Sequence, residues 1–296
     1  MRILVAGASG FVGRRLCPAL EQAGHDVRAM TRRPDSYRGA GQAVHGDVAD
    51  LESLAAAARG CEAAYYLVHS LDRAGFERED PAGADAFGLS ALRAGLERII
   101  YLGGLGDDRE SLSPHLRSRR EVEGRLGAAG VPVTTLRAGI IVGHGGISWE
   151  ITRQLVEHLP AMITPRWAHT RTQPIAIDDV VRYLVGGLDE PVTVGRAFEI
   201  GGAEVLRYLD MLHRVAAIEG RTRVIVPVPL LTPSLSAWWL ALVTDVDVRA
   251  GRTLVDSMTN EVVVRDDSIR ELVRFEPMDY DTAVLRALGE RARGKR

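Results

Sequence analysis

The sequence predicts an α/β fold, a doubly wound parallel sheet with a smaller C-terminal lobe. A short apolar run, Ile3 to Ala6, stops at a glycine and is followed by a helical pattern, as expected of a buried parallel strand that leads into a helix. Strand-like and helix-like segments then alternate up to Gly139, which favours a Rossmann-type sheet with strand order 3-2-1-4-5-6. We therefore expect a Rossmann domain at 1–144, completed by segments near 173–200. Residues 145–296 should form most of the lobe, interleaved with that domain.

Composition narrows the class of protein. The 296 residues are 46% hydrophobic, and 37 basic against 39 acidic side chains leave a formal net charge of −2. No field of one sign attracts nucleic acid or an anionic membrane. Cys17 and Cys61 lie in or beside apolar segments without ligand spacing, so we expect free buried thiols and no metal site. The N-terminus enters a core strand directly, which leaves no room for a signal peptide and predicts a cytoplasmic protein.

Three glycines between the first strand and the first helix have the spacing G-x-x-G-x-x-G. Gly7 allows a tight turn, Gly10 lets the backbone approach a phosphate, and Gly13 lets the helix pack on the sheet. The helix N-terminus presents free N–H groups to a pyrophosphate. The strand–glycines–helix context indicates a dinucleotide site rather than a merely structural turn. We expect the cofactor to contact Gly7, Ser9, Gly10, Phe11, Val12 and Gly13.

The end of the second strand bears on cofactor choice. Thr31 occupies the position where NAD-binding proteins carry an acidic residue, and Arg32 and Arg33 follow. A guanidinium can bind the 2′-phosphate of NADP, which a carboxylate would repel. We therefore expect NADP(H) to be preferred over NAD(H), although the two arginines could simply solvate a loop. Asp47 and the adjacent Val48 would meet the adenine, unless Asp47 only caps a turn.

The remaining elements follow from hydrophobic periodicity, caps and turn residues. Further strands are expected at Asp26–Met30, Gln42–His45, Ala63–Val68, Arg98–Leu102 and Val131–Leu136, and near 197–200, 222–226 and 261–264. Helices are expected at Phe11–Leu20, Leu51–Ala58 (capped by Asp50), Glu79–Ala94, Ser113–Ala129, Ile147–His158 and Asp179–Leu188 (capped by Asp178 or Asp179), and near 203–218, 234–243 and 266–274.

Two later segments are predicted to line a substrate pocket. Pro160–Pro174 is rich in Arg, Trp, His and Thr, so we expect an irregular pocket wall. Val224–Thr244 carries no formal charge, and its prolines argue against one membrane-spanning helix. A fold-back over the sheet edge is favoured, with an interfacial membrane segment as the alternative because Trp238 and Trp239 are adjacent.

Several motifs resemble the extended and atypical short-chain dehydrogenase/reductases. They are Gly7–Gly13, Gly46–Val48, Leu136–Gly143 and Pro174–Val180. Two further motifs are similar to an NmrA-like, NAD(P)H-binding branch whose members are often labelled nucleoside-diphosphate-sugar epimerases. These motifs are Tyr66–Ser70 and Asn260–Val264. The resemblance covers essentially the whole chain. It implies further cofactor contacts at Leu67, Val68, His69, Gly103, Ala138 and Gly139. His69 ends the fourth strand, where a lone histidine could equally be structural.

The resemblance also implies a catalytic set from which this chain departs. The superfamily uses a Ser after the fifth strand and a Tyr-x-x-x-Lys motif, in which Tyr is the acid/base and Lys lowers its pKa. Here Gly103 or Gly104 occupies the Ser position, and His115 and Arg119 align with Tyr and Lys. A spacing of four keeps both on one helical face. His115 could exchange protons and Arg119 could hold the ribose, or both could belong to a solvated helix face.

We therefore expect an NADP(H)-binding oxidoreductase that acts on a small apolar carbonyl, enone or quinone-like molecule. The expected substrate contacts are Gly104, Trp149, Arg171, Gln173 and Trp238. Two alternatives stay open. One is a non-catalytic NADPH sensor or assembly protein of NmrA type, and the other is a non-redox epimerase or isomerase that retains the cofactor. The sequence leaves the oligomeric state open.

Overall fold

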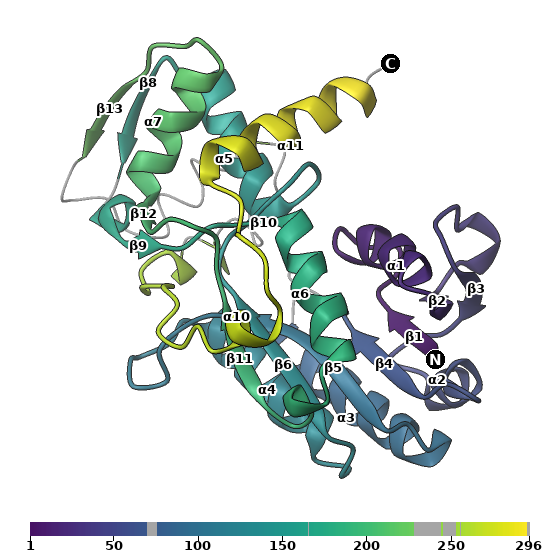
Figure 1. Cartoon of the computed structure of the whole chain (residues 1–296). Coiled ribbons are helices and arrows are strands. Elements are labelled where there is room, and N and C mark those ends of the chain that lie inside the picture. Colours follow the sequence, from purple (N-terminus) through teal and green to yellow (C-terminus); the bar gives the residue numbers. More distant parts are fainter. Residues whose placement is uncertain (70–75, 165, 228–243, 245–252, 255, 295–296) are drawn as a thin grey trace.

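The computed structural model describes residues 1–69, 76–164, 166–227, 244, 253–254 and 256–294 (Figure 1). The predicted helix near 234–243, together with Trp238 and Trp239, lies outside these ranges. So does most of the uncharged segment Val224–Thr244. No helix within the described ranges combines the length and the apolar character needed to cross a membrane.

A seven-stranded parallel sheet forms the centre of the molecule (Figure 1). Its strands are β1 (Arg2–Ala6), β2 (Asp26–Thr31), β3 (Gln42–His45), β4 (Ala63–Tyr66), β5 (Arg98–Gly104), β6 (Val133–Ala138) and β11 (Ala197–Ile200). The spatial order is β11-β6-β5-β4-β1-β2-β3. The predicted order 3-2-1-4-5-6 is confirmed, and β11 pairs with β6 at the edge.

Helices cover both faces of the sheet. On one face lie α1 (Gly13–Gln22) and α6 (Ile177–Asp189). On the other lie α2 (Leu51–Ala58), α3 (Phe76–Ala94) and α4 (Pro114–Gly127). Successive side chains of β1 alternate between the two layers: Ile3 and Val5 pack with α1 and α6 residues, whereas Leu4 and Ala6 pack with α2, α3 and α4 residues. This two-sided burial explains the continuous apolar run at the N-terminus.

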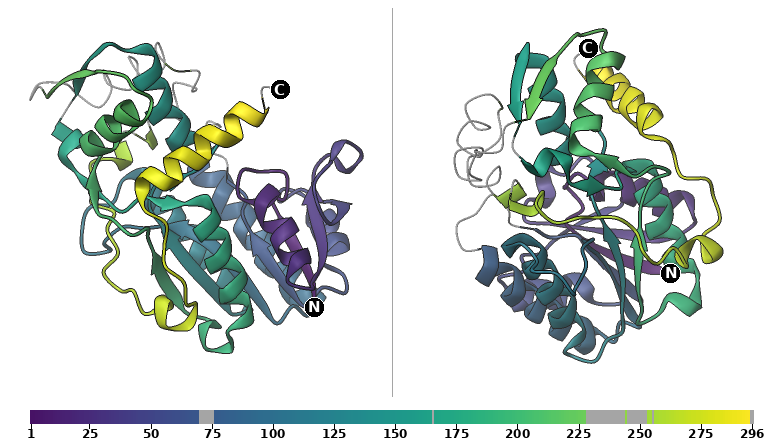
Figure 2. Two further views of the ribbon diagram at one scale, coloured as in Figure 1. Left: turned by 45° about the horizontal axis from the view of Figure 1, so that its top comes forward. Right: turned by 90° about the vertical axis from the view of Figure 1, so that its left-hand side faces the viewer.

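Most of the C-terminal lobe lies above the sheet in both views of Figure 2. The lobe has its own apolar core. Its main elements are α5 (Ile147–His158), α7 (Tyr208–Ile218), α11 (Tyr280–Gly294), and β8 (Ala161–Thr164) paired in parallel with β13 (Val224–Pro227). Shorter elements are η1 (Pro34–Ser36), η2 (Arg166–His169), η3 (Pro191–Thr193), β7 (Ile141–Val142), β9 (Arg171–Thr172), β10 (Ile175–Ala176), β12 (Leu206–Arg207) and α10 (Ile269–Leu272). The proposed boundary between 1–144 and 145–296 stays a prediction.

The structure corrects several predictions about this half of the chain. Pro160–Pro174 is not irregular, because it contains β8, η2 and β9 and because Ala168 and Thr172 are fully buried. The stretch 261–264 is no strand, and only Val262 makes an isolated bridge, to Thr172. The helix expected near 203–218 begins at residue 208, after the short strand β12.

Asp178 and Asp179, the predicted capping residues of α6, do not cap it. The N-cap is Ala176, which has no capping side chain. Asp178 and Asp179 lie in the first turn instead, where a negative charge is favourable beside the helix dipole. Asp179 is fully buried and accepts a hydrogen bond from the backbone N–H of Met278 at 2.7 Å. It therefore ties the C-terminal segment to the sheet domain.

The first turn of α1 packs directly on the loop that precedes it. Gly7 has φ +88°, and its carbonyl accepts from the N–H of Gly10 at 2.9 Å. A Cβ on Gly13 would lie 2.3 Å from the Gly7 oxygen and 2.7 Å from the Cα of Ala8. Both atoms belong to the backbone, so no side chain can move to make room.

We predict that Gly13→Ala destabilises the protein by about 2 kcal/mol or more, because overpacking against backbone forces a shift of α1. Gly124→Ala in α4 is the control, since a Cβ there meets nothing within 4 Å. The Gly124→Ala variant should be more stable by up to about 1 kcal/mol, because alanine has a higher helix propensity than glycine. Urea unfolding measures both, and equal midpoints for the two variants would contradict the packing argument.

Candidate cofactor and active site

A cavity of about 970 Å³ lies at the carboxyl ends of β1, β2 and β4. It is lined by the predicted residues Gly7, Ser9, Gly10, Thr31, Arg32 and Arg33. Asp47, Val48, Leu67, Val68 and His69, also predicted, line it as well. Ligands of open α/β sheets bind at this edge, and the volume suits a dinucleotide.

The glycine loop gives the cavity an anion-binding wall. The first turn of α1 contains no acidic residue. Its free N–H groups point out of the helix N-terminus toward the glycine loop, as in phosphate sites at helix N-termini. A Cβ on Gly10 would meet only the Gly7 oxygen within 4 Å, which leaves the outer side of that residue open. The loop therefore fits a pyrophosphate.

Arginines dominate the charge of the cavity. Arg14 and Arg38 line it together with the predicted Arg32 and Arg33, whereas Asp47 is the one carboxylate among its lining residues. The Asp47 carboxylate accepts the N–H of Ala49 at 3.0 Å. Among the described residues, no carboxylate forms an ion pair with Arg14, Arg32 or Arg33. These guanidinium groups are available for an anionic ligand.

A cluster of titratable side chains, which we call the histidine cluster, adjoins His69. It consists of His69, Asp80, His115 and Arg119. The His69 and His115 rings lie 5.4 Å apart between centroids, and His69 Nδ1 lies 3.3 Å from the Asp80 carboxylate. Arg119 Nη1 lies 3.5 Å from the Tyr101 hydroxyl. The structure thus brings the predicted catalytic pair, His115 and Arg119, beside a residue of the cofactor cavity.

Burial and the Arg119 cation keep both histidines neutral. Burial lowers the pKa of His69 well below its ordinary value of 6.5, and the positive charge of Arg119 lowers it further. The same two causes, followed by His69 itself, lower the pKa of His115, while Asp80 opposes them. Neutral imidazoles offer one donor and one acceptor each. His69 Nε2 and His115 Nδ1 are buried with no hydrogen-bond partner among the described residues.

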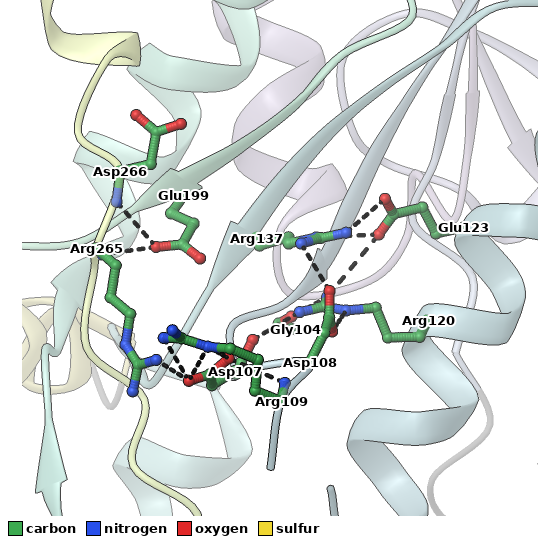
Figure 3. Close-up of polar contacts among 11 residues, drawn as sticks. Gly104, Asp107, Asp108, Arg109, Arg120, Glu123, Arg137, Glu199, Arg265 and Asp266 are labelled. Carbon is green, nitrogen blue, oxygen red and sulfur yellow. Dashed lines mark hydrogen bonds and ion pairs between the residues drawn. The ribbon is translucent and has the colours of Figure 1, made fainter.

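An ion network holds α4, the helix that carries His115 and Arg119 (Figure 3). Arg120 donates to the carbonyl of Gly104 at 2.8 Å and pairs with Asp108 at 2.5 Å. Arg137 of β6 pairs with Glu123 of α4 at 2.9 Å. Because both arginines are largely shielded from solvent, these pairs are screened less than surface pairs.

The C-terminal segment completes that network (Figure 3). Arg265 pairs with Asp107 in the loop after β5, and the backbone N–H groups of Arg265 and Asp266 donate to Glu199 of β11. Asn260 accepts from the N–H of Ser113, the N-cap of α4, and donates to the carbonyl of Ser111. The start of α4 is therefore fixed by residues more than 140 positions later in the chain.

Other predicted site residues do not line the cavity. Gly13 packs inside the loop, as described, and Phe11 lies beside Gly143 and Gly146. The predicted cofactor contacts outside the lining, together with the neighbouring Gly104, are Phe11, Val12, Gly13, Gly103, Gly104, Ala138 and Gly139. A Cβ on Gly104 would lie 2.9 Å from Leu116 of α4. Gly104 therefore serves the close contact with α4, and its carbonyl holds Arg120.

The predicted substrate residues occupy separate places. Trp149 is 1% exposed in the core of the C-terminal lobe, a core position rather than a wall of the cavity. Arg171 is exposed and pairs with Glu261 at 3.7 Å. Gln173 donates to the carbonyl of Gly202 and accepts from the N–H of Val264. Trp238 lies outside the described residues.

Comparison with known proteins now identifies the family. Residues 7–166 match the NAD(P)H-binding family. The chain belongs to the NAD(P)H-binding family. The resemblance to atypical short-chain dehydrogenase/reductases is confirmed.

Two curated relatives of the NAD(P)H-binding chain carry different functional names. An uncharacterized sugar epimerase of Bacillus subtilis (YhfK) is 28% identical over 68% of this chain and 94% of its own length. The (4-alkanoyl-5-oxo-2,5-dihydrofuran-3-yl)methyl phosphate reductase of Streptomyces griseus is 27% identical over 74% of each chain.

Solved structures share the fold. A nucleoside-diphosphate-sugar epimerase from Staphylococcus aureus superposes with a TM-score of 0.78 at 15% identity, over 96% of this chain and 99% of that one. The triphenylmethane reductase of Citrobacter sp., complexed with NADP(H), also has a TM-score of 0.78 at 15% identity, over 97% of this chain and 100% of that one. At this identity the likeness concerns the fold alone.

Sequence reasoning missed several residues of the NAD(P)H cavity. Arg14 directly follows the third glycine, a position that could have been included because the first helical turn faces the phosphates. Arg38 lies in a loop without periodicity, so no local signal indicated it. Asp80 lies within the predicted helix and gave no sign that it contacts His69. The residues missed are Arg14, Met30, Ser36, Tyr37, Arg38, Gly39, Gly46 and Asp80.

The lowered pKa of His69 and His115 predicts a pH-dependent stability. Because the pKa of each histidine is lower in the folded protein than in the unfolded chain, the unfolded chain takes up more protons below about pH 6.5. Stability from this source is present above that pH and is lost as the pH falls, by up to about 1.4 kcal/mol per pH unit for each histidine. Urea unfolding between pH 7 and 5 should show a steeper loss for the unmodified protein than for His115→Gln. Parallel curves would contradict the burial of a neutral His115.

Proposed function

We propose that this protein is an NADP(H)-dependent reductase that acts on a small apolar carbonyl, enone or quinone-like substrate. One observation carries the proposal. A single cavity runs from the arginines after β2, past the glycine loop, to His69, and His69 in turn contacts the predicted catalytic residue His115. The site therefore pairs an anion-binding end with a titratable, largely buried end.

Arg32 is the residue best placed to select NADP(H). It follows Thr31 at the end of β2, where the adenosine ribose of a dinucleotide lies in this fold. Arg33 adds a second cation, and the exposed Arg14 and Arg38 line the same cavity. Asp47 and Val48 are proposed to meet the adenine, and the glycine loop the pyrophosphate.

Bound NADPH supplies a hydride, and this chain's residues determine which acceptors suit it. His115 and Arg119 stand where the superfamily has Tyr and Lys, and His115 is neutral at pH 7. A neutral imidazole polarises an oxygen weakly compared with a tuned acid. Conjugated acceptors, which spread the negative charge that arrives with the hydride, are therefore the preferred substrates.

The reductases among the relatives support a redox reaction. Besides the Streptomyces griseus enzyme, a ceramide reductase of Caulobacter vibrioides is 29% identical over 64% of this chain and 62% of its own length. The contacts of His69 with Asp80 and His115 beside the cavity favour chemistry over a sensor that only binds NADPH, since clusters of buried titratable groups gather at catalytic sites.

The cofactor prediction concerns Arg32. NADPH should bind about ten- to a hundredfold more tightly than NADH, as a charge-assisted hydrogen bond contributes roughly 1.5–3 kcal/mol. Arg32→Ala should remove most of that preference and leave NADH affinity unchanged. Fluorescence titration with both cofactors measures the four dissociation constants. Equal values for the unmodified protein would rule out NADP(H) preference.

The substrate prediction concerns His115. The protein should oxidise NADPH with quinones or conjugated enones and reduce simple ketones poorly, since general acid catalysis contributes about 10²–10⁴-fold. If His115 is the acid, His115→Phe should abolish turnover while NADPH still binds. Steady-state rates over an acceptor panel, with a parallel binding titration, test this. Unchanged turnover would remove His115 from the site, and absence of turnover with every acceptor would favour a sensor.

A further inference from the structure

We propose that His69, held by the Asp80 carboxylate, is the residue that exchanges a proton with the substrate oxygen. This inference rests on the proposed reductase function and refines it. His69 is the one member of the histidine cluster that lines the cofactor cavity. His115 and Arg119 stand behind it on α4, and Asp80 backs it from α3.

The contact with Asp80 selects the tautomer of His69. A carboxylate can only accept a hydrogen bond, so the His69 nitrogen 3.3 Å away, Nδ1, carries the proton. Asp80 is 5% exposed and comes from a regular helix, so its position is fixed by packing. The neutral ring then presents the lone pair of Nε2.

That lone pair has no partner among the described residues. His69 Nε2 is buried and unpaired, while the side chain as a whole is 22% exposed and His69 lines the cavity. An unpaired buried nitrogen costs free energy unless a ligand satisfies it. A substrate hydroxyl or carbonyl oxygen in the cavity is the chemistry that would do so.

The surroundings set the protonation state of the His69–Asp80 pair. Among the described residues, the titratable and charged groups nearby are Tyr66 of β4, Tyr101 of β5, Asp80 of α3, and His115 and Arg119 of α4. Arg119 opposes a positive charge on His69, and burial does the same. At neutral pH the pair is therefore a proton acceptor, poised for an alcohol substrate and NADP⁺.

The reaction balances in both directions. In reduction, the carbonyl carbon accepts the hydride of NADPH, the C=O π electrons move to oxygen, and protonated His69 gives its Nε2 proton to that oxygen. The products are the alcohol, NADP⁺ and neutral His69. In oxidation, neutral Nε2 takes the hydroxyl proton while the hydride leaves the carbinol carbon for NADP⁺. Simple ketone reduction is slow at pH 7 because few His69 rings then carry the second proton.

The inference predicts opposite pH profiles for the two directions. The rate of reduction of a simple ketone such as cyclohexanone should rise about tenfold per pH unit as the pH falls toward the pKa of His69. Oxidation of cyclohexanol should be level at and above neutral pH. Both profiles should persist in Asp85→Asn, the matched control on α3, whose carboxylate is half-exposed and pairs with Arg125.

Asp80→Asn tests the positioning role. The amide N–H can donate to Nδ1, which moves the proton of neutral His69 to Nε2 and removes the acceptor. The kcat of alcohol oxidation should fall about 10²–10⁴-fold, with KM and NADPH affinity nearly unchanged, and Asp80→Glu should restore part of the rate. Equal kcat and equal pH profiles for Asp80→Asn and Asp85→Asn would overturn the inference. So would loss of proton transfer in His115→Gln with His69→Gln unaffected.

A second readout needs no turnover. ¹⁵N NMR of the imidazoles, with and without NADP⁺, should show His69 protonated at Nδ1 in the unmodified protein and at Nε2 in Asp80→Asn. An Nε2–H tautomer in the unmodified protein would overturn the His69–Asp80 assignment whatever the activity. Failure of NADPH binding, or of hydride transfer to every acceptor, would instead refute the proposed function and leave the tautomer as the decisive observation for the pair.

Discussion

The contact between Gly13 and the carbonyl of Gly7 is the constraint on which the site depends. Without a side chain at residue 13, α1 packs against the loop that leaves β1, so its N-terminus stays beside the cavity. Gly7 in turn leaves no room for a Cβ, because the carbonyl of Leu67 would lie 2.9 Å away. The loop after β1 is thus pressed against the chain that follows β4, and Leu67, Val68 and His69 reach the same cavity as the glycines.

Two kinds of positive charge serve this site differently. Arg32 and Arg33 are exposed, so salt weakens their attraction for an anion and water competes for their donors. Arg119 lies close to the buried rings of His69 and His115, where the effective dielectric constant is low and its charge therefore interacts more strongly with them than it would in water. Exposed arginines can therefore select a ligand by its charge, whereas Arg119 adds to the effect of burial in lowering the pKa of His69 and of His115.

Local pattern was enough to predict the Rossmann half of the chain. β3 and α2 have the expected bounds because each is a short periodic segment with clear breakers, and Asp50 caps α2 through the N–H of Glu52, as expected. The cavity lining around the glycines and Arg32 also follows from spacing along the sequence.

The structural features that the sequence pattern did not predict depend on contacts between residues far apart in the chain. β8 is stabilised by pairing with β13, about sixty residues later, so Pro160–Pro174 alone looked irregular. Trp149 is polar enough for a pocket wall, yet the apolar face of α5 buries it in the lobe core. The Asp80–His69 contact joins a helix to a strand end, and no periodicity encodes it.

The ion pair between Arg15 and Glu290 joins residues 275 positions apart. Arg15 also donates to the carbonyls of Phe11 and His144, so one guanidinium links the glycine loop, the middle of the chain and its last helix. During synthesis, Arg15 leaves the ribosome 275 residues before Glu290. Contacts of such long range are slow to form. The Rossmann sheet can therefore form around β1 to β6 well before the Arg15–Glu290 ion pair does. The face of α1 that meets α11 acquires its native neighbours late in folding.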